Sequence, residues 1–324
     1  MKLAATIRDE IYRAIPVRWK ENFGGDFYDK YLKLRLKMLD ARVEWYGAEH
    51  KIEYTIIERG KAEKLIFLPG FADTKENFYN AAQFLYQECD MIIVDLPGFG
   101  KSFKRKGEIY NLANYAKWVG EFVEQTGWTD FHLVGNSLGG AVAVELALSM
   151  GERLKSLTLV DCAGVVLKDQ PSIYREFLDG RNIFEIATPF QFQYFLNRVF
   201  HTPPPIPPFV FDHLYREFHK HSKWHKKVLH DLLEGITTLD DPRMEEFTLN
   251  NRLKNIRVPT MIVWGDEDTF FPAATADFIH SQIPGSSLYL LPDRGHGPQV
   301  EAPRQFTHLL KKFIRRHYRA LAAE

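Results

Sequence analysis

Hydrophobic residues along the chain are concentrated in eight short segments that end in turn-forming residues. The last six segments are nearly continuous runs of Val, Ile, Leu and aromatic residues, without strict alternation of apolar and polar positions. Strands that are buried on both faces show this pattern, as in a parallel sheet covered by helices. The predicted strands fall at residues 42–47, 51–59, 64–70, 90–98, 131–136, 154–161, 260–266 and 287–293.

Segments with helical periodicity separate several of these strands, at residues 78–88, 112–126, 140–150 and 273–283. Alternation of strands and helices predicts an α/β fold with a mostly parallel, eight-stranded sheet and helices on both faces. Ligands of such sheets bind beyond the carboxyl ends of the strands, so reactive side chains are expected in the turns there.

The chain before the first strand has a different pattern. Residues 1–40 predict two helices, and the adjacent glycines Gly24 and Gly25 are expected to break the helical pattern between them. We therefore expect residues 1–42 to form an N-terminal helical extension.

The connection between the sixth and seventh strands is unusually long. About 100 residues lie between Asp161 and Pro259, where a single crossover helix would suffice. Long connections at this edge of a sheet commonly carry function. We expect residues 164–250 to form a helical cap, and residues 43–163 and 251–324 to form the core.

The predicted cap contains seven Phe between Phe184 and Phe211, together with the proline-rich run 202–209. Proline is excluded from helix and strand interiors, so the run is expected to be a stiff strut or hinge. The Phe side chains have two interpretations. They form the cap's own hydrophobic core, or they line a channel for an acyl chain, for which Phe184, Phe192 and Phe195 are candidates.

A candidate nucleophile follows the fifth strand. Ser137 stands in the sequence Gly-Asn-Ser-Leu-Gly, with Gly135 and Gly139 two residues to either side. Glycine inside a strand or helix costs roughly 0.5–1 kcal/mol relative to alanine, so this spacing indicates a steric requirement. A sharp strand-to-helix turn imposes one, and the pattern is that of a nucleophile elbow. A glycine-rich turn with an incidental serine is the alternative.

An acid and a histidine follow the seventh and eighth strands. His296 can accept the serine proton and release it again at neutral pH, because imidazole has a pKa of about 6.5. Asp268, three residues after Gly265, would hold the second ring N–H and stabilise the imidazolium. Asp161 and Asp266 are alternative acids, and the spacing from the glycine favours Asp268.

The turn after the third strand supplies a candidate oxyanion site. Gly70 allows close backbone approach, so the N–H of Phe71 can point to the same place as the N–H of Leu138. Two such donors would stabilise a tetrahedral oxyanion, each by on the order of 3 kcal/mol.

Together these motifs resemble those of serine hydrolases of the α/β-hydrolase superfamily, over about residues 43–318. Besides the elbow, the resemblance rests on Asp-Leu-Pro-Gly-Phe-Gly-Lys-Ser from Asp95, Gly-Asp-Glu-Asp from Gly265, and Gly295-His296 followed by Glu301-Ala302-Pro303. The chain is similar to monoacylglycerol lipase and carboxylesterase-type members, which carry a helical cap after the sixth strand. Pro69 stands where many members have a histidine, but the oxyanion donor is a backbone N–H, so the site is expected to persist.

The motifs therefore predict a serine carboxylic-ester hydrolase that works through an acyl-enzyme and needs no cofactor or metal. The expected partner is a small ester with an apolar acyl chain, such as a monoacylglycerol. One alternative is a hydrolase that cleaves carbon–carbon bonds of ring-fission diketones. Such enzymes usually have a polar, glycine-rich oxyanion loop, which residues 69–78 do not resemble. A non-catalytic ligand receptor on this scaffold is the second alternative.

The composition limits the class of binding partner and the cellular compartment that we expect. The 42 Lys and Arg balance the 42 Asp and Glu, so no net field favours nucleic acid. Two cysteines, Cys89 and Cys162, form no disulfide framework. The sequence shows no signal-peptide pattern and no run of 18 apolar residues, so we expect a cytoplasmic protein.

Basic residues occur in two predicted helices near the ends of the chain. Solvated helix faces are the favoured interpretation, and weak peripheral contact with a membrane is the second. These residues are Lys33, Arg35, Lys37, Lys311, Lys312, Arg315 and Arg316.

Three other polar patterns have simpler interpretations than a binding site. The four cap histidines His219, His221, His225 and His230 are interspersed with lysines and lack zinc-ligand spacing, so a solvated helix is expected. Residues 98–102 lack the first glycine of a phosphate-binding loop, since position 95 is Asp, and predict a turn. His132 lies back along its strand and is expected to be a core residue.

Overall fold

A computed structural model describes residues 17–321, with side chains described for residues 23–317. All eight predicted strands form one sheet in the order β1-β2-β4-β3-β5-β6-β7-β8. Strand β2 pairs antiparallel with β1 and β4, and the other neighbours are parallel. The strands are β1 (Arg42–Tyr46), β2 (Ile52–Ile57), β3 (Glu63–Leu68), β4 (Cys89–Val94), β5 (Phe131–Asn136), β6 (Leu154–Val160), β7 (Thr260–Gly265) and β8 (Ser287–Leu291).

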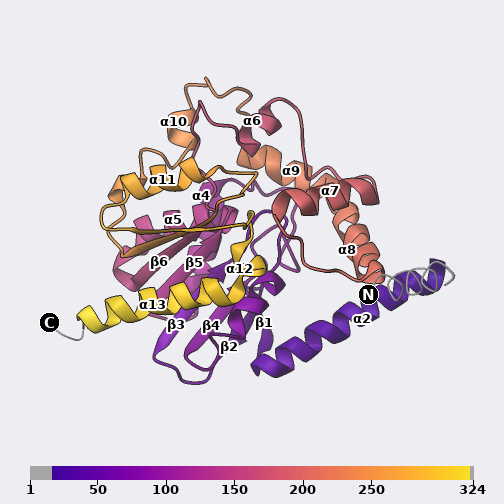
Figure 1. The fold of residues 1–324 in the computed structure, drawn as a ribbon, viewed down its shortest axis with the longest axis horizontal. Coiled ribbons are helices and arrows are strands. Elements are labelled where there is room, and N and C mark those ends of the chain that lie inside the picture. The colour runs from indigo at the N-terminus through magenta and orange to yellow at the C-terminus, as the bar shows by residue number, and fades with distance from the viewer. Residues whose placement is uncertain (1–16, 322–324) are drawn as a thin grey trace.

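Helices cover both faces of this sheet, as the alternation of elements predicts (Figure 1). One face packs on α4 (Leu112–Gln125), α5 (Leu138–Met150) and α11 (Ala273–Gln282). The other packs on α2 (Val17–Leu39), α3 (Tyr79–Ala82) and α13 (Pro303–Leu321). Alternate residues of one strand serve the two faces, so Leu65 and Phe67 join one core cluster and Ile66 and Leu68 the other. Short helical segments are η1 (Lys75–Phe78), η2 (Gly151–Arg153), η3 (Leu253–Asn255) and α12 (Pro298–Glu301).

The predicted break at Gly24 and Gly25 is wrong. Helix α2 runs through both glycines without interruption, while the earlier predicted helix falls largely outside the described residues. A Cβ on Gly24 would overlap the carbonyl oxygen of Phe209 in α8 (Pro208–Lys220). The absence of a side chain therefore serves close packing between two helices that are far apart in the sequence.

The predicted helix over residues 78–88 is also too long. Regular helix ends at Ala82, and residues 83–88 form turns that lead into β4. Hydrogen bonds of the i→i+3 type, such as Phe84 N to Ala81 O, replace a continuous helical ladder there.

Five helices lie between β6 and β7, and we refer to residues 164–250 as the cap (Figure 1). The proline-rich run has no regular structure until Pro208, which begins α8 at a position where proline is favoured. None of the described helices is both long and apolar enough to cross a lipid bilayer. The cap helices are α6 (Ile173–Leu178), α7 (Pro189–Val199), α8 (Pro208–Lys220), α9 (Ser222–Leu232) and α10 (Met244–Phe247).

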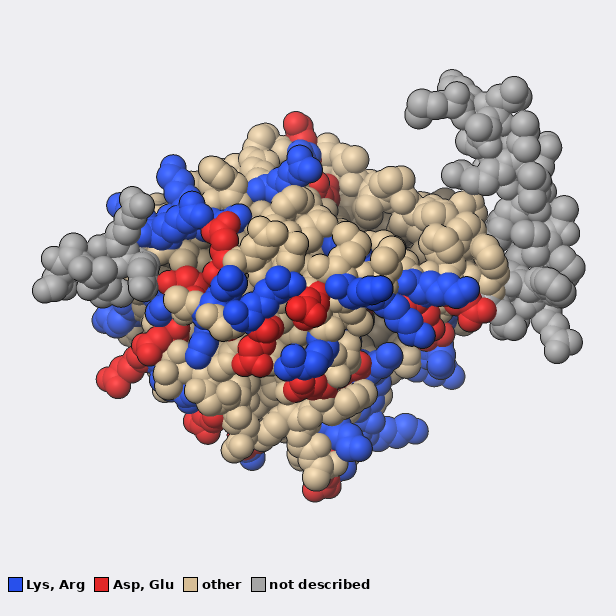
Figure 2. Space-filling model, turned by 90° about the horizontal axis from the view of Figure 1, so that it is seen from below, with Lys and Arg blue, Asp and Glu red and all other residues tan. Residues whose placement is uncertain are grey.

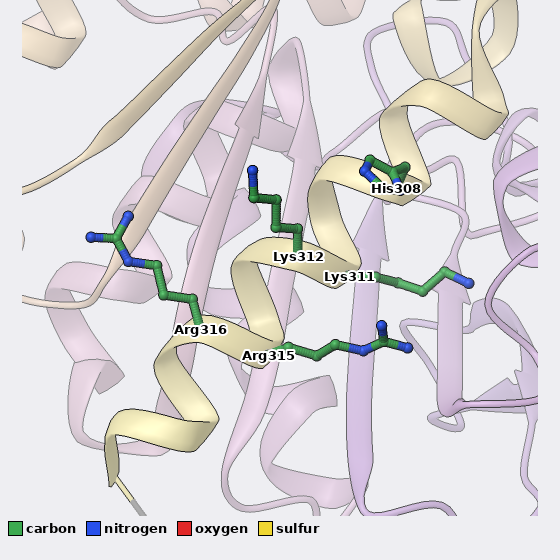
Figure 3. Close-up of a pocket in the computed structure, with 5 residues that line it drawn as sticks. All are labelled: His308, Lys311, Lys312, Arg315 and Arg316. Atoms are coloured by element: carbon green, nitrogen blue, oxygen red, sulfur yellow. The ribbon is translucent and has the colours of Figure 1, made fainter.

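The basic side chains of α13 do not converge on one point. They border a hollow of about 450 Å³, but Lys312 and Arg316 point to one side of the helix and Lys311 and Arg315 to the other (Figure 3). Lys311 and Arg315 both pair with Glu88, at 2.8 and 2.6 Å. Lys and Arg are interspersed with Asp and Glu on the face seen from below (Figure 2). These contacts fit a solvated helix face.

Candidate active site

Ser137 occupies a strained turn between β5 and α5. Its backbone has φ 53° and ψ −120°, outside the regions that residues with side chains prefer. A Cβ on Gly135 would collide with the backbone of Gly139, and a Cβ on Gly139 with the carbonyl oxygen of Leu68. Both flanking glycines thus have the steric reason that their spacing predicts.

Backbone strain recurs in the turns that follow the neighbouring strands. Ala72, Ser137, Asp161 and Asp293 all have positive φ values, of 55°, 53°, 42° and 56°. Such conformations cost of order 1–3 kcal/mol each and tend to cluster at functional sites. Four of the seven described non-Gly residues with positive φ therefore lie at the carboxyl edge of the sheet, and the other three, Asp40, Asp130 and Glu234, lie elsewhere.

His296 and Asp268 form a buried pair at this edge. The His296 Nδ1 lies 2.8 Å from Asp268 Oδ2. Asp268 Oδ1 accepts the backbone N–H groups of Phe270 and Phe271, at 2.7 and 3.2 Å. The rings of the same two residues pack on the imidazole, with centroids 4.7 and 5.4 Å away. An Nδ1–H held by a carboxylate leaves Nε2 unprotonated and available as a base.

The turn that carries Ser137 is tied to the histidine turn by Asn136. The Asn136 side chain donates to the carbonyl oxygens of His296 (3.3 Å) and Val160 (3.1 Å). No direct hydrogen bond joins the Ser137 hydroxyl to the His296 ring in the described residues. Contacts of this kind are often long in an unliganded site and tighten when substrate binds.

The alternative acids lie in different environments. Asp266 is exposed. Asp161 is fully buried next to Asp268, and its Oδ1 accepts the Gly265 N–H at 2.9 Å. Burial and the Asp268 charge raise the pKa of Asp161 well above its usual value. The Asp161 Oδ2 atom is buried and has no hydrogen-bond partner among the described residues.

Polar atoms of Asp161, Asp268 and His296 lie within 4.8 Å of one another, a spacing that could also hold a cation. Asp268 Oδ2 already pairs with His296 Nδ1, whereas Asp161 Oδ2 has no hydrogen-bond partner among the described residues.

The turn after β3 lies against Ser137. A Cβ on Gly70 would be 3.1 Å from the Ser137 Cβ and 3.6 Å from its Oγ. The Phe71 and Leu138 N–H groups have no protein acceptor in the described part of the chain. Both donors remain available to a substrate oxygen next to the serine.

The end of cap helix α7 contacts the proposed histidine and acid turns, which sequence reasoning did not predict. The His296 N–H donates to the Val199 carbonyl at 2.7 Å. Arg198 donates to the Thr269 hydroxyl and carbonyl, at 2.8 and 3.1 Å, and pairs with Glu176 at 2.8 Å. No local motif marks Val199 or Arg198, because their partners are about 70 to 100 residues away in the chain.

Glu301 provides a second link between the histidine turn and the cap. Its carboxylate accepts the N–H groups of Gly295 and Thr202, each at 2.8 Å. The motif that follows His296 includes this glutamate, but its partner in the cap is visible only in the folded chain.

The candidate cap residues form a chain of rings that leads away from Phe71 in the turn after β3. Phe184 packs on Phe71 with ring centroids 4.5 Å apart, and on Phe195 at 5.6 Å. Phe192 lies farther back, against Phe195, Phe211 and other rings within the cap. Both interpretations of the aromatic residues therefore have support: Phe184 faces the site, and Phe192 belongs to the cap core.

The prediction of a solvated histidine helix is wrong for His225. His230 is exposed, but His225 is buried between Phe218 and Phe99, and burial lowers its pKa to about 3. This side of α9 faces Phe71 and Phe99, which a local count of lysines does not reveal. His132 is a core residue as expected, bonded to Ser156 and Glu63 at 2.7 and 2.9 Å.

The turn prediction for residues 98–102 is confirmed. Buried Asp95 accepts the backbone N–H of Lys101 at 3.0 Å, and its carbonyl accepts the Ser102 hydroxyl at 2.6 Å. A Cβ on Gly100 would overlap the Asp95 carboxylate. The glycine thus allows the turn to wrap around Asp95.

Comparison with known proteins agrees with this fold. The sequence profile of the alpha/beta hydrolase family matches residues 65–309. Lipase 3 of Moraxella sp. (strain TA144) is 30% identical over 270 residues, which cover 81% of each chain. A monoacylglycerol lipase of Mus musculus is 25% identical, over 79% of this chain and 76% of its own. The crystal structure of a membrane phospholipase A described as a bacterial virulence factor superposes with a TM-score of 0.85 and 23% identity, over 98% and 99% of the two chains.

Proposed function

This chain belongs to the alpha/beta hydrolase family and is an ester hydrolase, and we propose that Ser137, His296 and Asp268 are its catalytic triad. The observation that carries the assignment is the strained Ser137 turn, which lies beside two unused N–H donors and is tied to the His296–Asp268 pair. The chain order Ser, Asp, His agrees with that of α/β hydrolases.

The proposed reaction begins with attack of Ser137 Oγ on the ester carbonyl carbon. The hydroxyl proton moves to His296 Nε2, and the carbonyl electron pair moves to oxygen, which the Phe71 and Leu138 N–H groups stabilise. Collapse of this intermediate breaks the bond to the alcohol, which leaves with the proton from His296. Water then repeats the sequence on the acyl-enzyme and releases the acid.

We propose lipid-like esters, such as monoacylglycerols, as the substrate class. Phe71, Phe184 and Phe195 form an apolar path that begins beside the proposed oxyanion site. Contact with such a wall can contribute about 0.8 kcal/mol per buried methylene of an acyl chain. The names of related lipases support the same class. We also propose that residues 164–250 act as a cap domain that supplies this wall.

Covalent labelling tests the nucleophile directly. A fluorophosphonate probe should label the wild-type protein at Ser137 and fail to label Ser137→Ala. The Ser137→Ala and His296→Ala variants should each lose roughly a million-fold in kcat on p-nitrophenyl esters, because the two groups act as a unit. More than a few per cent of wild-type activity in either folded variant would overturn the assignment.

A further inference from the structure

Helix α2 carries a stripe of exposed apolar side chains. Phe23, Phe27, Tyr31, Leu34 and Met38 are 52%, 44%, 43%, 56% and 59% exposed. Their spacing of three or four residues places all five along one side of the helix. At 1.5 Å per residue the stripe extends about 22 Å.

A different side of α2 holds the helix against the protein. Leu39 is buried in the core, Tyr28 packs on His213 with ring centroids 5.7 Å apart, and Gly24 lies against the backbone of Phe209. These contacts anchor the helix, while the stripe residues remain 43–59% exposed and only the rings of Phe23 and Phe27 also reach Phe209.

A row of lysines borders the stripe on its solvent side. Lys30, Lys33 and Lys37 each precede a stripe residue by one position, which places them on the next row around the helix. All three are exposed, and none forms an ion pair with another described residue. Asp26 completes this row.

We propose that the α2 stripe docks on an anionic lipid surface, with the helix lying in the plane of the interface. An apolar face bordered by lysines matches acyl chains that lie beneath anionic headgroups. A second copy of the chain, packed stripe to stripe, would instead bring two lysine rows near each other. Charge complementarity therefore favours lipid over self-association.

Docking through α2 would also bring the cap to the membrane. The rings of Phe23 and Phe27 lie 5.1 and 5.0 Å from that of Phe209, at the start of α8. In Figure 1 the lower end of α8 meets α2. This inference goes beyond the proposed reaction and does not depend on the identity of the nucleophile.

Vesicle sedimentation of the full chain tests the proposal. The Ser137→Ala background prevents any hydrolysis of the lipids and should bind vesicles normally. Phosphatidylcholine vesicles with and without phosphatidylglycerol serve as the probes. Adding Leu34→Ser and Met38→Ser should weaken binding at least about 30-fold, because together they remove about five methylene-sized groups from the hydrocarbon and each fully buried group is worth up to about fourfold. Ile109→Ser is the matched control, because Ile109 is 58% exposed outside α2.

A separate prediction concerns the lysine row. Replacing Lys30, Lys33 and Lys37 with Gln should weaken binding to anionic vesicles at low salt by on the order of 100-fold, or about fivefold per lysine, and should leave the weaker binding to neutral vesicles unchanged. Hydrolysis of a soluble acetate ester by the same α2 variants, in the Ser137 form, should equal that of wild type and report an intact fold. Equal vesicle binding by wild type and the Leu34/Met38 variant would overturn the proposal. The proposal would also be overturned if sedimentation velocity showed that the Leu34/Met38 variant has an altered oligomeric state while its vesicle binding is unchanged.

Discussion

Replacing Asp161 with asparagine separates the roles of the two buried carboxyls at the strand ends. An asparagine side chain at this position can accept the Gly265 N–H through oxygen and direct its amide N–H toward Asp268, a donor that Asp161 supplies only when it is protonated. We therefore expect Asp161→Asn to keep kcat within a few-fold of wild type. Asp268→Asn should lose on the order of 10⁴, because it favours the wrong tautomer of His296.

The same substitution should change how stability depends on pH. The pKa of Asp161 is raised in the folded state, so above the unfolded value of about 3.9 the folded protein holds a proton that the unfolded chain loses. The stability contributed by this group is complete below that pH and is lost as pH rises toward the folded-state pKa. The loss amounts to about 1.4 kcal/mol per pH unit in this window.

Asparagine has no proton to release, so the free energy of unfolding of Asp161→Asn does not decrease with pH through this group. The free energy of unfolding of Asp161→Asn, minus that of wild type, should increase by about 1.4 kcal/mol per pH unit above about pH 4.5, until the folded-state pKa is reached. Urea unfolding at several pH values measures this difference, and kcat on p-nitrophenyl acetate measures activity. The exposed Asp266 supplies the control, and Asp266→Asn should be neutral in both assays.

Two results would refute the reasoning. A loss of kcat in Asp161→Asn equal to that in Asp268→Asn would mean that Asp161 acts as a charged member of the site. A stability difference that does not vary with pH would mean that Asp161 is ionised in the folded protein.

Three further predictions concern the cap and α2. The kcat/KM should rise with acyl length by at most about fourfold per methylene, and Phe184→Ala should flatten this slope without changing the hydrolysis of acetate esters. The control Phe190→Ala, at an 81% exposed position, should leave the slope unchanged. An unchanged slope in Phe184→Ala would remove the case for an acyl channel. Phe192→Ala should lower the free energy of unfolding by about 3–5 kcal/mol and depress all esters together, which thermal and urea unfolding would detect; a stable variant would contradict its place in the cap core. Gly24→Ala should destabilise the protein, although alanine favours helix by about 1 kcal/mol relative to glycine. Gly25→Ala should be tolerated, because its Cβ would lie 3.3 Å from the movable His213 ring. Equal melting temperatures for the two variants would argue against the α2–α8 contact.

The strands and the proposed nucleophile could be predicted from the sequence alone. A strand buried on both faces needs a continuous apolar run, whatever its neighbours are, so the central strands were predictable. The partly exposed edge strands β1 and β8 were indicated by short apolar and aromatic segments that end in turn residues. The turn at Ser137 needs two glycines because Cβ atoms at these positions would collide with nearby backbone, and the spacing of the two glycines is visible in the local sequence. Chain order then indicated Asp268 and His296, since the ends of parallel strands share one edge.

Only the tertiary structure decided the roles that depend on distant partners. Gly24 lies in a continuous helix because α8, almost 200 residues later, approaches its backbone. His225 is buried because α9 folds back toward Phe99, and Asp161 lies next to Asp268 because β6 and β7 are adjacent. In each case burial and a neighbouring charge or backbone segment determine the conformation, the exposure or the pKa of the residue. These are properties of the space around a side chain, and the local sequence does not specify that space.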